Sequence, residues 1–404
     1  MDIQRPIRFL DRTSAPHLFT LIALASISAL GSNIFLPSLP MMTEHFGTTP
    51  AIMGLSVGVF LAASAVMQLV SGPVSDAVGR RPVMFVALIV FSIASVACIY
   101  ATNIVIFLIL RAIQASAAVT LTLSRAIVRD VVGGERAASM IAYVTMGTSL
   151  VPMLSPALGG YLGQHFGWQS TFWLMGGLGA FLTLLCLLDQ GETAPGAGSR
   201  LRDQMREYPV LLRSRRFWGY CLSAALGSGA FFAYLGGAPF VGTHVFGLDP
   251  QVLGIVFGAP AVGYLLGNFV SGRYSARVGI FTMTITGLFV TSSGSLLSLL
   301  VSMAGYGSAL SFFGLMTLVG VGNGLTLPNA TAGMMSVRPE LAGSASGLGG
   351  AIMIGGGAIL SAIAGFVLVM GETEFPLQLI MAVSAGAGVI TLLLMIPRHA
   401  RALA

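Results

Sequence analysis

One arginine of this sequence stands deep inside a long apolar segment. Arg111 comes seven residues after Ile104, the start of that segment, which corresponds to a depth of about 10 Å in a helix. Gln114 follows one turn later on the same helical face. A guanidinium in such a place normally faces a partner or a water-filled space, so Arg111 and Gln114 are candidate substrate-binding residues. The alternative is a structural arginine that reaches the interface or binds backbone carbonyls.

Asn33 lies at a similar depth in an earlier apolar segment, and we expect it to face Arg111. Its amide oxygen can accept a hydrogen bond from a guanidinium, but the side chain cannot carry a proton. All 14 acidic residues fall in loops or at the ends of apolar segments. An uncompensated Arg111 favours an anionic or zwitterionic substrate, because an anion offsets the cost of burying the charge. Proton coupling would then use competition at Arg111, the substrate's own titration, or an acid at the rim such as Asp130.

Other polar and aromatic residues inside apolar segments are further candidates for a substrate cavity. The alternative for each is a role in packing one helix against another. They are Phe231, Phe232, Tyr234, Tyr264, Asn268, Asn323, Asn329 and Met353.

The segments that carry these residues are membrane spans. Of 404 residues, 55% are apolar and 8% are charged, against about 25% charged in soluble domains, and the mean hydropathy is +0.88. A bilayer crossing takes about 20 apolar residues. Twelve segments meet this length, and we place them at 17–39, 50–70, 82–100, 104–128, 137–161, 168–188, 217–240, 250–272, 279–301, 308–330, 341–370 and 375–396.

The arginines support this count, because they occupy every second loop. By the positive-inside rule, both termini and the polar segment 189–216 are cytoplasmic. The net charge of +6 is scattered between apolar segments rather than gathered on one face, which excludes a nucleic-acid-binding protein. No constellation for catalysis, metal binding or a channel filter is visible, so we expect neither an enzyme nor a cofactor.

An internal repeat divides the chain into two halves of six spans. Residues 71–79 and 271–279 are identical at five of nine positions, and each stretch follows the second span of its half. We therefore expect a first bundle over 1–188, a linker over 189–216 and a second bundle over 217–404. Two copies of one unit place the substrate near the midplane, between the halves.

The sequence from Gly72 to Pro82 resembles the signature of the major facilitator superfamily between spans two and three. The resemblance implies a tight cytoplasmic turn and a conformational latch for the outward-facing state. The residues that match are Gly72, Asp76, Gly79, Arg80 and, at the end of span four, Asp130. Ala77 replaces the usual basic residue of this signature.

Two further stretches resemble signatures of the same superfamily. The first runs from Arg111 to Gln114 in span four. The second, in span five, is similar to the antiporter signature of exporters, with Ser155 in place of a common glycine. It implies a bent helix that packs tightly against the other half, and its residues are Pro152, Ser155, Pro156, Gly159 and Gly160.

Together with residues 33–40, these motifs resemble the Bcr/CflA branch of drug exporters. The resemblance implies an all-α major facilitator fold, with twelve transmembrane helices in two pseudo-symmetric six-helix bundles around a central cavity. It also implies a monomer in a bacterial inner membrane that exports drugs or antibiotics by proton-coupled antiport. Asn33 replaces the aspartate usual in this branch, which leaves two alternatives open: an exporter of an anionic metabolite or metal chelator, and an uncoupled facilitator.

Overall fold

The computed structural model describes residues 9–12, 16–132, 144, 147–148, 151–193, 209–338, 342–368 and 373–396. Within these residues the structure is built of helices and contains no strand. Eleven helical segments of the described chain are long and apolar enough to cross a membrane, and each corresponds to one of the predicted spans. The remaining prediction, 137–161, lies partly outside the described residues, and its described part is α8 (Val151–Phe166). The predicted all-α architecture is confirmed for the described residues.

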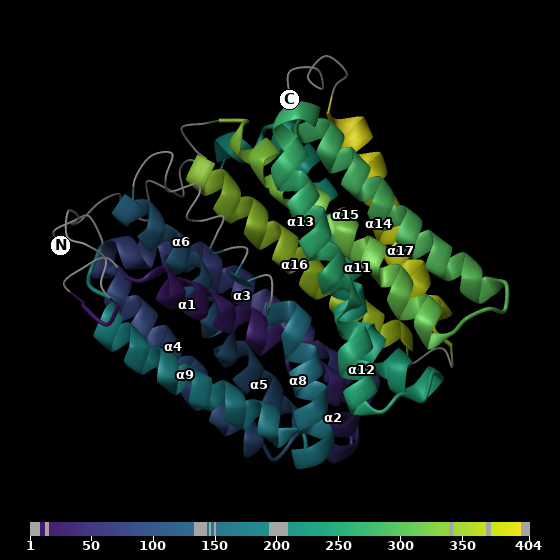
Figure 1. Cartoon of the computed structure of the whole chain (residues 1–404), viewed down its shortest axis with the longest axis horizontal. Coiled ribbons are helices and arrows are strands. Elements are labelled where there is room, and N and C mark those ends of the chain that lie inside the picture. The colour runs from purple at the N-terminus through teal and green to yellow at the C-terminus, as the bar shows by residue number, and fades with distance from the viewer. Residues whose placement is uncertain are drawn as a thin grey trace.

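The first half forms one bundle and the second half another (Figure 1). The first contains α1 (Leu18–Asn33), η1 (Leu36–Ser38), α2 (Leu39–His45), α3 (Pro50–Val78), α4 (Arg80–Ile99), α5 (Ile104–Gln114), η2 (Ala115–Ala117), α6 (Ala118–Val132), α8 and α9 (Gln169–Asp189). The second contains α11 (Arg215–Phe240), η3 (Val241–Val245), α12 (Pro250–Phe257), α13 (Ala259–Val278), α14 (Ile280–Met303), α15 (Ala309–Met335), α16 (Ala342–Leu368) and α17 (Phe375–Met395).

Matching turns in the two bundles confirm the internal repeat. Gly79 links α3 to α4 at φ +113°, and Gly279 links α13 to α14 at φ +90°. These angles favour glycine because a Cβ would be strained there. The amide of Gly79 donates to Ser75 O at 3.0 Å, and that of Gly279 donates to Ser275 O at 2.9 Å. The turn is therefore shorter than predicted. The residues of the signature up to Val78 belong to α3, and Gly79 alone lies between α3 and α4.

The two bundles meet closely at the end of the molecule opposite the chain termini, which we call the far end (Figure 1). There α3 packs against α16, and α8 packs against α12. A Cβ added to Gly58 would lie 3.2 Å from Ala358 O, and one added to Gly160 would overlap the carbonyl group of Pro250. The halves thus touch backbone to backbone at the far end.

Candidate functional site

Arg111 is fully buried within the first half. Its Nε donates to Ser56 O at 3.3 Å, and its Nη1 donates to Gly31 O at 3.1 Å. The guanidinium carbon lies 4.2 Å from the ring centroid of Phe35 and 4.5 Å from that of Phe60. Such aromatic faces attract a cation. Nη2 has no hydrogen-bond partner among the described residues. In this state the arginine is bound by backbone carbonyls and rings, which is the structural alternative raised by its sequence position.

Gln114 extends this buried network. Its Oε1 accepts a hydrogen bond from Nη1 of Arg111, and its Nε2 donates to Ser95 Oγ at 2.7 Å. Nε2 also lies 3.6 Å from the Sδ atom of Met175. The predicted pairing of Arg111 with Gln114 on one helix face is therefore present, and it ties span four to α4 and α9.

Asn33 is also buried, but its side chain bonds along its own helix. Nδ2 donates to Ala29 O at 2.7 Å and to Ser32 Oγ at 2.8 Å. In the described residues no hydrogen bond joins Asn33 to Arg111, so the predicted contact is absent from this structure. Asparagine near a helix end commonly bonds a carbonyl four residues back, and here that local bond competes with the distant guanidinium.

Two predicted cavity residues of α11 belong instead to an aromatic cluster in the second half. Tyr234 is buried, stacks on Phe257 with ring centroids 4.7 Å apart, and donates its hydroxyl to Phe257 O at 3.0 Å. Phe231 stacks on Tyr234 at 6.4 Å. The ring of Phe232 packs against Gly357 of α16. Tyr234 thus has a packing role in this state, whereas Phe231 and Phe232 remain partly exposed.

The other predicted cavity residues divide in the same way. Tyr264 and Asn268 are half-buried neighbours on α13, where Asn268 Nδ2 donates to Tyr264 O at 2.9 Å. Asn329 is buried and donates to Ser271 Oγ at 2.8 Å, so it links α15 to α13. Asn323 is buried, and its Oδ1 has no partner in the described part of the chain. Met353 is half-buried against the apolar core of the second half.

Arg125 is a charged residue that the sequence analysis did not single out. It lies within the fourth span, Ile104–Val128, and α6 continues beyond it to Val132. Its side chain is exposed. Its position three residues inside the end of an apolar segment was the signal available in the sequence.

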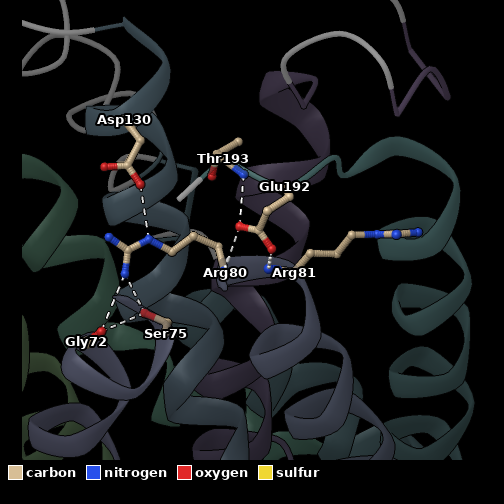
Figure 2. Close-up of polar contacts among 7 residues, drawn as sticks. All are labelled: Gly72, Ser75, Arg80, Arg81, Asp130, Glu192 and Thr193. Carbon is tan, nitrogen blue, oxygen red and sulfur yellow. Dashed lines mark hydrogen bonds and ion pairs between the residues drawn. The ribbon is translucent and has the colours of Figure 1, made fainter. Parts of the chain in front are cut away.

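The predicted latch residues of the first half gather around Arg80, at the termini end (Figure 2). Arg80 Nε forms a buried ion pair with Asp130 Oδ2 at 3.0 Å. Nη1 donates to Ser75 Oγ and, at 3.5 Å, to Gly72 O. Arg80 thereby clamps the last turns of α3 to the end of α6. The side chain of Asp76 lies outside the described residues.

Glu192, which no sequence motif pointed to, caps the first turn of α4 (Figure 2). Its Oε1 accepts the amide of Arg80 at 2.8 Å, and its Oε2 accepts that of Arg81 at 3.2 Å. A carboxylate is favourable there because the first amides of a helix have no partner within it and carry a partial positive charge. The residue comes from the beginning of the predicted linker, so this part of the linker is attached to the first half.

Asp189 makes a second attachment of this kind. It is buried at the end of α9, where Oδ1 accepts the amide of Leu10 at 2.6 Å and Oδ2 accepts that of His17 at 3.0 Å. Both oxygens of this acid therefore hold the backbone that leads into α1.

The residues of the antiporter-like signature lie on α8, between the two halves at the far end. Pro156 is inside the helix, where its missing amide removes a helical hydrogen bond. A Cβ on Gly159 would overlap Ile34 O of the same half, and one on Gly160 would overlap Pro250 O of the other. Pro152 is half-buried, and Ser155 is buried with its hydroxyl unpartnered in the described chain. The two glycines let α8 contact both halves through backbone.

Comparison with known proteins agrees with this architecture. The sequence model described as Major Facilitator Superfamily matches residues 21–362 and 243–403. An uncharacterized MFS-type transporter, YdgK, of Bacillus subtilis (strain 168) is 30% identical over 388 residues, which is 92% of each chain. A bicyclomycin resistance protein homolog of Haemophilus influenzae is 24% identical over 86% of this chain and 88% of its own. A chloramphenicol resistance protein of Pseudomonas aeruginosa is 27% identical over 81% and 79%. The resistance proteins confirm the resemblance to the Bcr/CflA branch.

Solved structures share the fold at low sequence identity. The nucleoside transporter NupG superposes with a TM-score of 0.76 over 94% of this chain and 99% of its own, at 17% identity. A bacterial homolog of the human lysosomal transporter Spinster, inward-facing and occupied, superposes with a TM-score of 0.70 over 94% of both chains, at 18% identity. The paired bundles, the repeated glycine turn, the family match and these relatives lead to one conclusion: this chain belongs to the major facilitator superfamily.

Proposed function

We propose that this chain is a secondary active exporter of small organic molecules, with drug-like compounds and antibiotics as substrates. It works by alternating access, in which bundle 1–188 and bundle 217–404 rock about a site between them while 189–216 connects them. The relatives named for bicyclomycin and chloramphenicol resistance support the direction of transport and the substrate class.

The observation that carries the proposal is the asymmetric contact between the halves. Backbone packs on backbone where α8 meets α12 and α3 meets α16, and both contacts lie at the far end. Two rigid bundles that touch at one end can separate there and close at the other. The glycines suit such a motion because the helices meet there through backbone, and the side chain of Gln164 on α8 accepts the amide of Gln251 on α12 at 3.2 Å across the same contact.

We place both termini in the cytoplasm of a bacterium, with the protein in the inner membrane. The described arginines at the ends of the spans or beyond them, such as Arg81, Arg213 and Arg277, lie at the termini end, whereas Glu44 and Asp249 lie at the far end. This distribution follows the positive-inside rule. The state seen here then opens toward the cytoplasm, which is the side from which an exporter loads.

We also propose proton coupling. The proton binds to an acid at the end of a span rather than to an acid in the middle of one. Asp130 follows the end of span four at the termini end, where it forms the ion pair with Arg80. We propose that this pair opens and closes with the transport cycle and that Asp130 takes up the proton when the pair is broken. The position of Asn33 supports a second candidate function, an uncoupled facilitator, because asparagine cannot titrate.

Growth of an efflux-deficient bacterium that expresses this chain tests export. We expect raised resistance to chloramphenicol or bicyclomycin, and we expect Asp76→Asn to abolish it, with Arg213→Gln as a control that removes a charge outside the spans. Normal membrane insertion without resistance to any compound of the panel would contradict the proposed export.

Everted vesicles separate the two coupling modes. A proton antiporter accumulates substrate above its external concentration when respiration acidifies the lumen, and a protonophore, which removes both the pH difference and the membrane potential, abolishes the excess. A facilitator reaches equal concentrations whether or not the gradient is present. Accumulation that a protonophore leaves unchanged would contradict proton coupling.

A further inference from the structure

The helix α12 of the second half is capped at the far end by a residue of the first half. Oε1 of Gln164, on α8, accepts the amide of Gln251 at 3.2 Å, where α8 lies beside α12 (Figure 1). Gln251 is the second residue of α12, so its amide is one of those that have no partner within the helix. Gln164 comes one turn after Gly160, on the face of α8 that meets Pro250. The start of α12 is therefore bound across the contact between the halves.

The residue that ordinarily makes such a bond is the N-cap of the helix, which here is Asp249. Its backbone has the extended conformation of an N-cap, with φ −64° and ψ 151°, but its side chain makes no capping hydrogen bond. Aspartate is among the residues preferred at this position, where a side-chain oxygen accepts the amide of the second or third helical residue. The side chain is exposed, so it can turn toward the helix without breaking core packing. Gln164 thus occupies an amide that Asp249 is suited to bind.

The equivalent helix of the first half is capped by its own N-cap residue. Thr49 precedes the first residue of α3 as Asp249 precedes the first residue of α12, and in both helices that first residue is proline. Oγ1 of Thr49 accepts the amide of Ile52 at 3.4 Å. The cap supplied from the opposite half is therefore a property of α12 and is not shared by the repeated unit.

We propose that Gln164 and Asp249 are alternative caps of α12 that exchange in each transport cycle. Gln164 belongs to the other half, so its bond to Gln251 exists only while the far end is closed. When the far end opens, this amide loses its partner, and the carboxylate of Asp249 binds it instead. The start of α12 is then capped in both states, which reduces the difference in free energy between them. This inference rests on the proposed alternating access and adds a device that balances its two states.

Spin-label distances in the purified full chain, held in phosphatidylcholine nanodiscs, test this exchange. In a variant whose native cysteines are replaced, labels at Tyr100 and Tyr306, both exposed at the far end, give the ratio of open to closed molecules. We expect Asp249→Ala to lower this ratio by about fivefold, because only the open state depends on Asp249 for its cap. Asp249→Asn should leave the ratio unchanged, since asparagine is an equally good cap. Glu44→Ala, which removes another exposed acid at the far end, should also leave it unchanged.

Gln164→Ala supplies the decisive comparison. Alone, it should change the ratio less than Asp249→Ala does, because Asp249 can then cap α12 in the closed state as well. Combined with Asp249→Ala, it should restore the ratio of the unmodified chain, because α12 then lacks a cap in both states. The two substitutions are therefore coupled in a way that independent losses of stability would not produce.

Three results would overturn the inference. The first is an unchanged ratio in Asp249→Ala, and the second is an equal shift in Asp249→Ala and in the double variant. The third is an equal shift in Asp249→Asn and Asp249→Ala, which would assign the effect to charge rather than to capping. Any of these results, obtained with both states populated, would refute the cap exchange and leave the proposed function standing. A single state in every variant would contradict alternating access itself.

Discussion

Gly160 offers a direct way to shift the balance between the two transport states. In this structure a Cβ at Gly160 would overlap the carbonyl oxygen of Pro250 and lie 3.1 Å from its carbonyl carbon. Pro250 belongs to the other half, so the contact exists only while the far end is closed. We predict that Gly160→Ala opens the far end and favours the opposite, outward-open state.

The size of the effect follows from this overlap. The obstacle is backbone rather than the tip of a flexible side chain, so the helices must separate by about 1 Å to restore ordinary contact. Overpacking of this kind costs about 1–3 kcal/mol. Only the closed far end carries this cost, so the population ratio of the two states should shift by about 5- to 150-fold.

Spin-label distances measure this shift. In a variant whose native cysteines are replaced, one label pair at Tyr100 and Tyr306 reports on the far end, and another at Val78 and Val278 reports on the termini end. All four positions are exposed. With Gly160→Ala we expect longer distances in the first pair and shorter ones in the second.

Two other glycine substitutions are matched controls. Gly177→Ala, on α9, places its methyl group in open space and should leave both distances unchanged. Gly159→Ala would overlap Ile34 O within the same half, so it should lower thermal stability in every state rather than shift the distances. If Gly160→Ala gave the same distances as Gly177→Ala, the reasoning from interhelical contact would be refuted.

Three further predictions concern the polar groups of the first half. Glu192→Ala should lower stability by about 1–2 kcal/mol, because the amide of Arg80 loses its cap, and Glu192→Gln should lower it less; thermal unfolding of the purified protein measures both. Arg111→Ala should cost about 3 kcal/mol or more and should largely mask the effect of a second change, Gln114→Ala, since the two side chains form one network. Asp130→Asn should cost more alone than when combined with Arg80→Gln, because the single change leaves a buried cation without its partner; additive losses would contradict a direct pairing.

Much of the fold could be predicted from the sequence because the bilayer limits what a chain can do. Spans need about 20 apolar residues, and the arginines mark alternate ends, so span number and order follow from a one-dimensional pattern. The two copies of the repeat, 71–79 and 271–279, also share one backbone geometry, since both end in a glycine with positive φ. Helix ends were harder to predict: α3 continues to Val78 through residues that look like a loop by composition.

The candidate site was less predictable, because it depends on contacts between residues far apart in the chain. Arg111 was an evident candidate by its depth, yet Gly31 and Ser56 supply carbonyls from 80 and 55 residues away. Glu192 carried no motif, and its partners lie 112 and 111 residues earlier.

The sequence by itself determined a twelve-span transporter of the major facilitator superfamily with two related halves. Only the tertiary structure decided which charged groups the protein's own packing satisfies. Arg111 and Arg125 lie in the same span and have the same chemistry, but only Arg111 meets carbonyls that pack around it. The physical reason is that a hydrogen bond needs a partner within about 3 Å in a defined direction, and hydropathy along the chain does not encode that proximity.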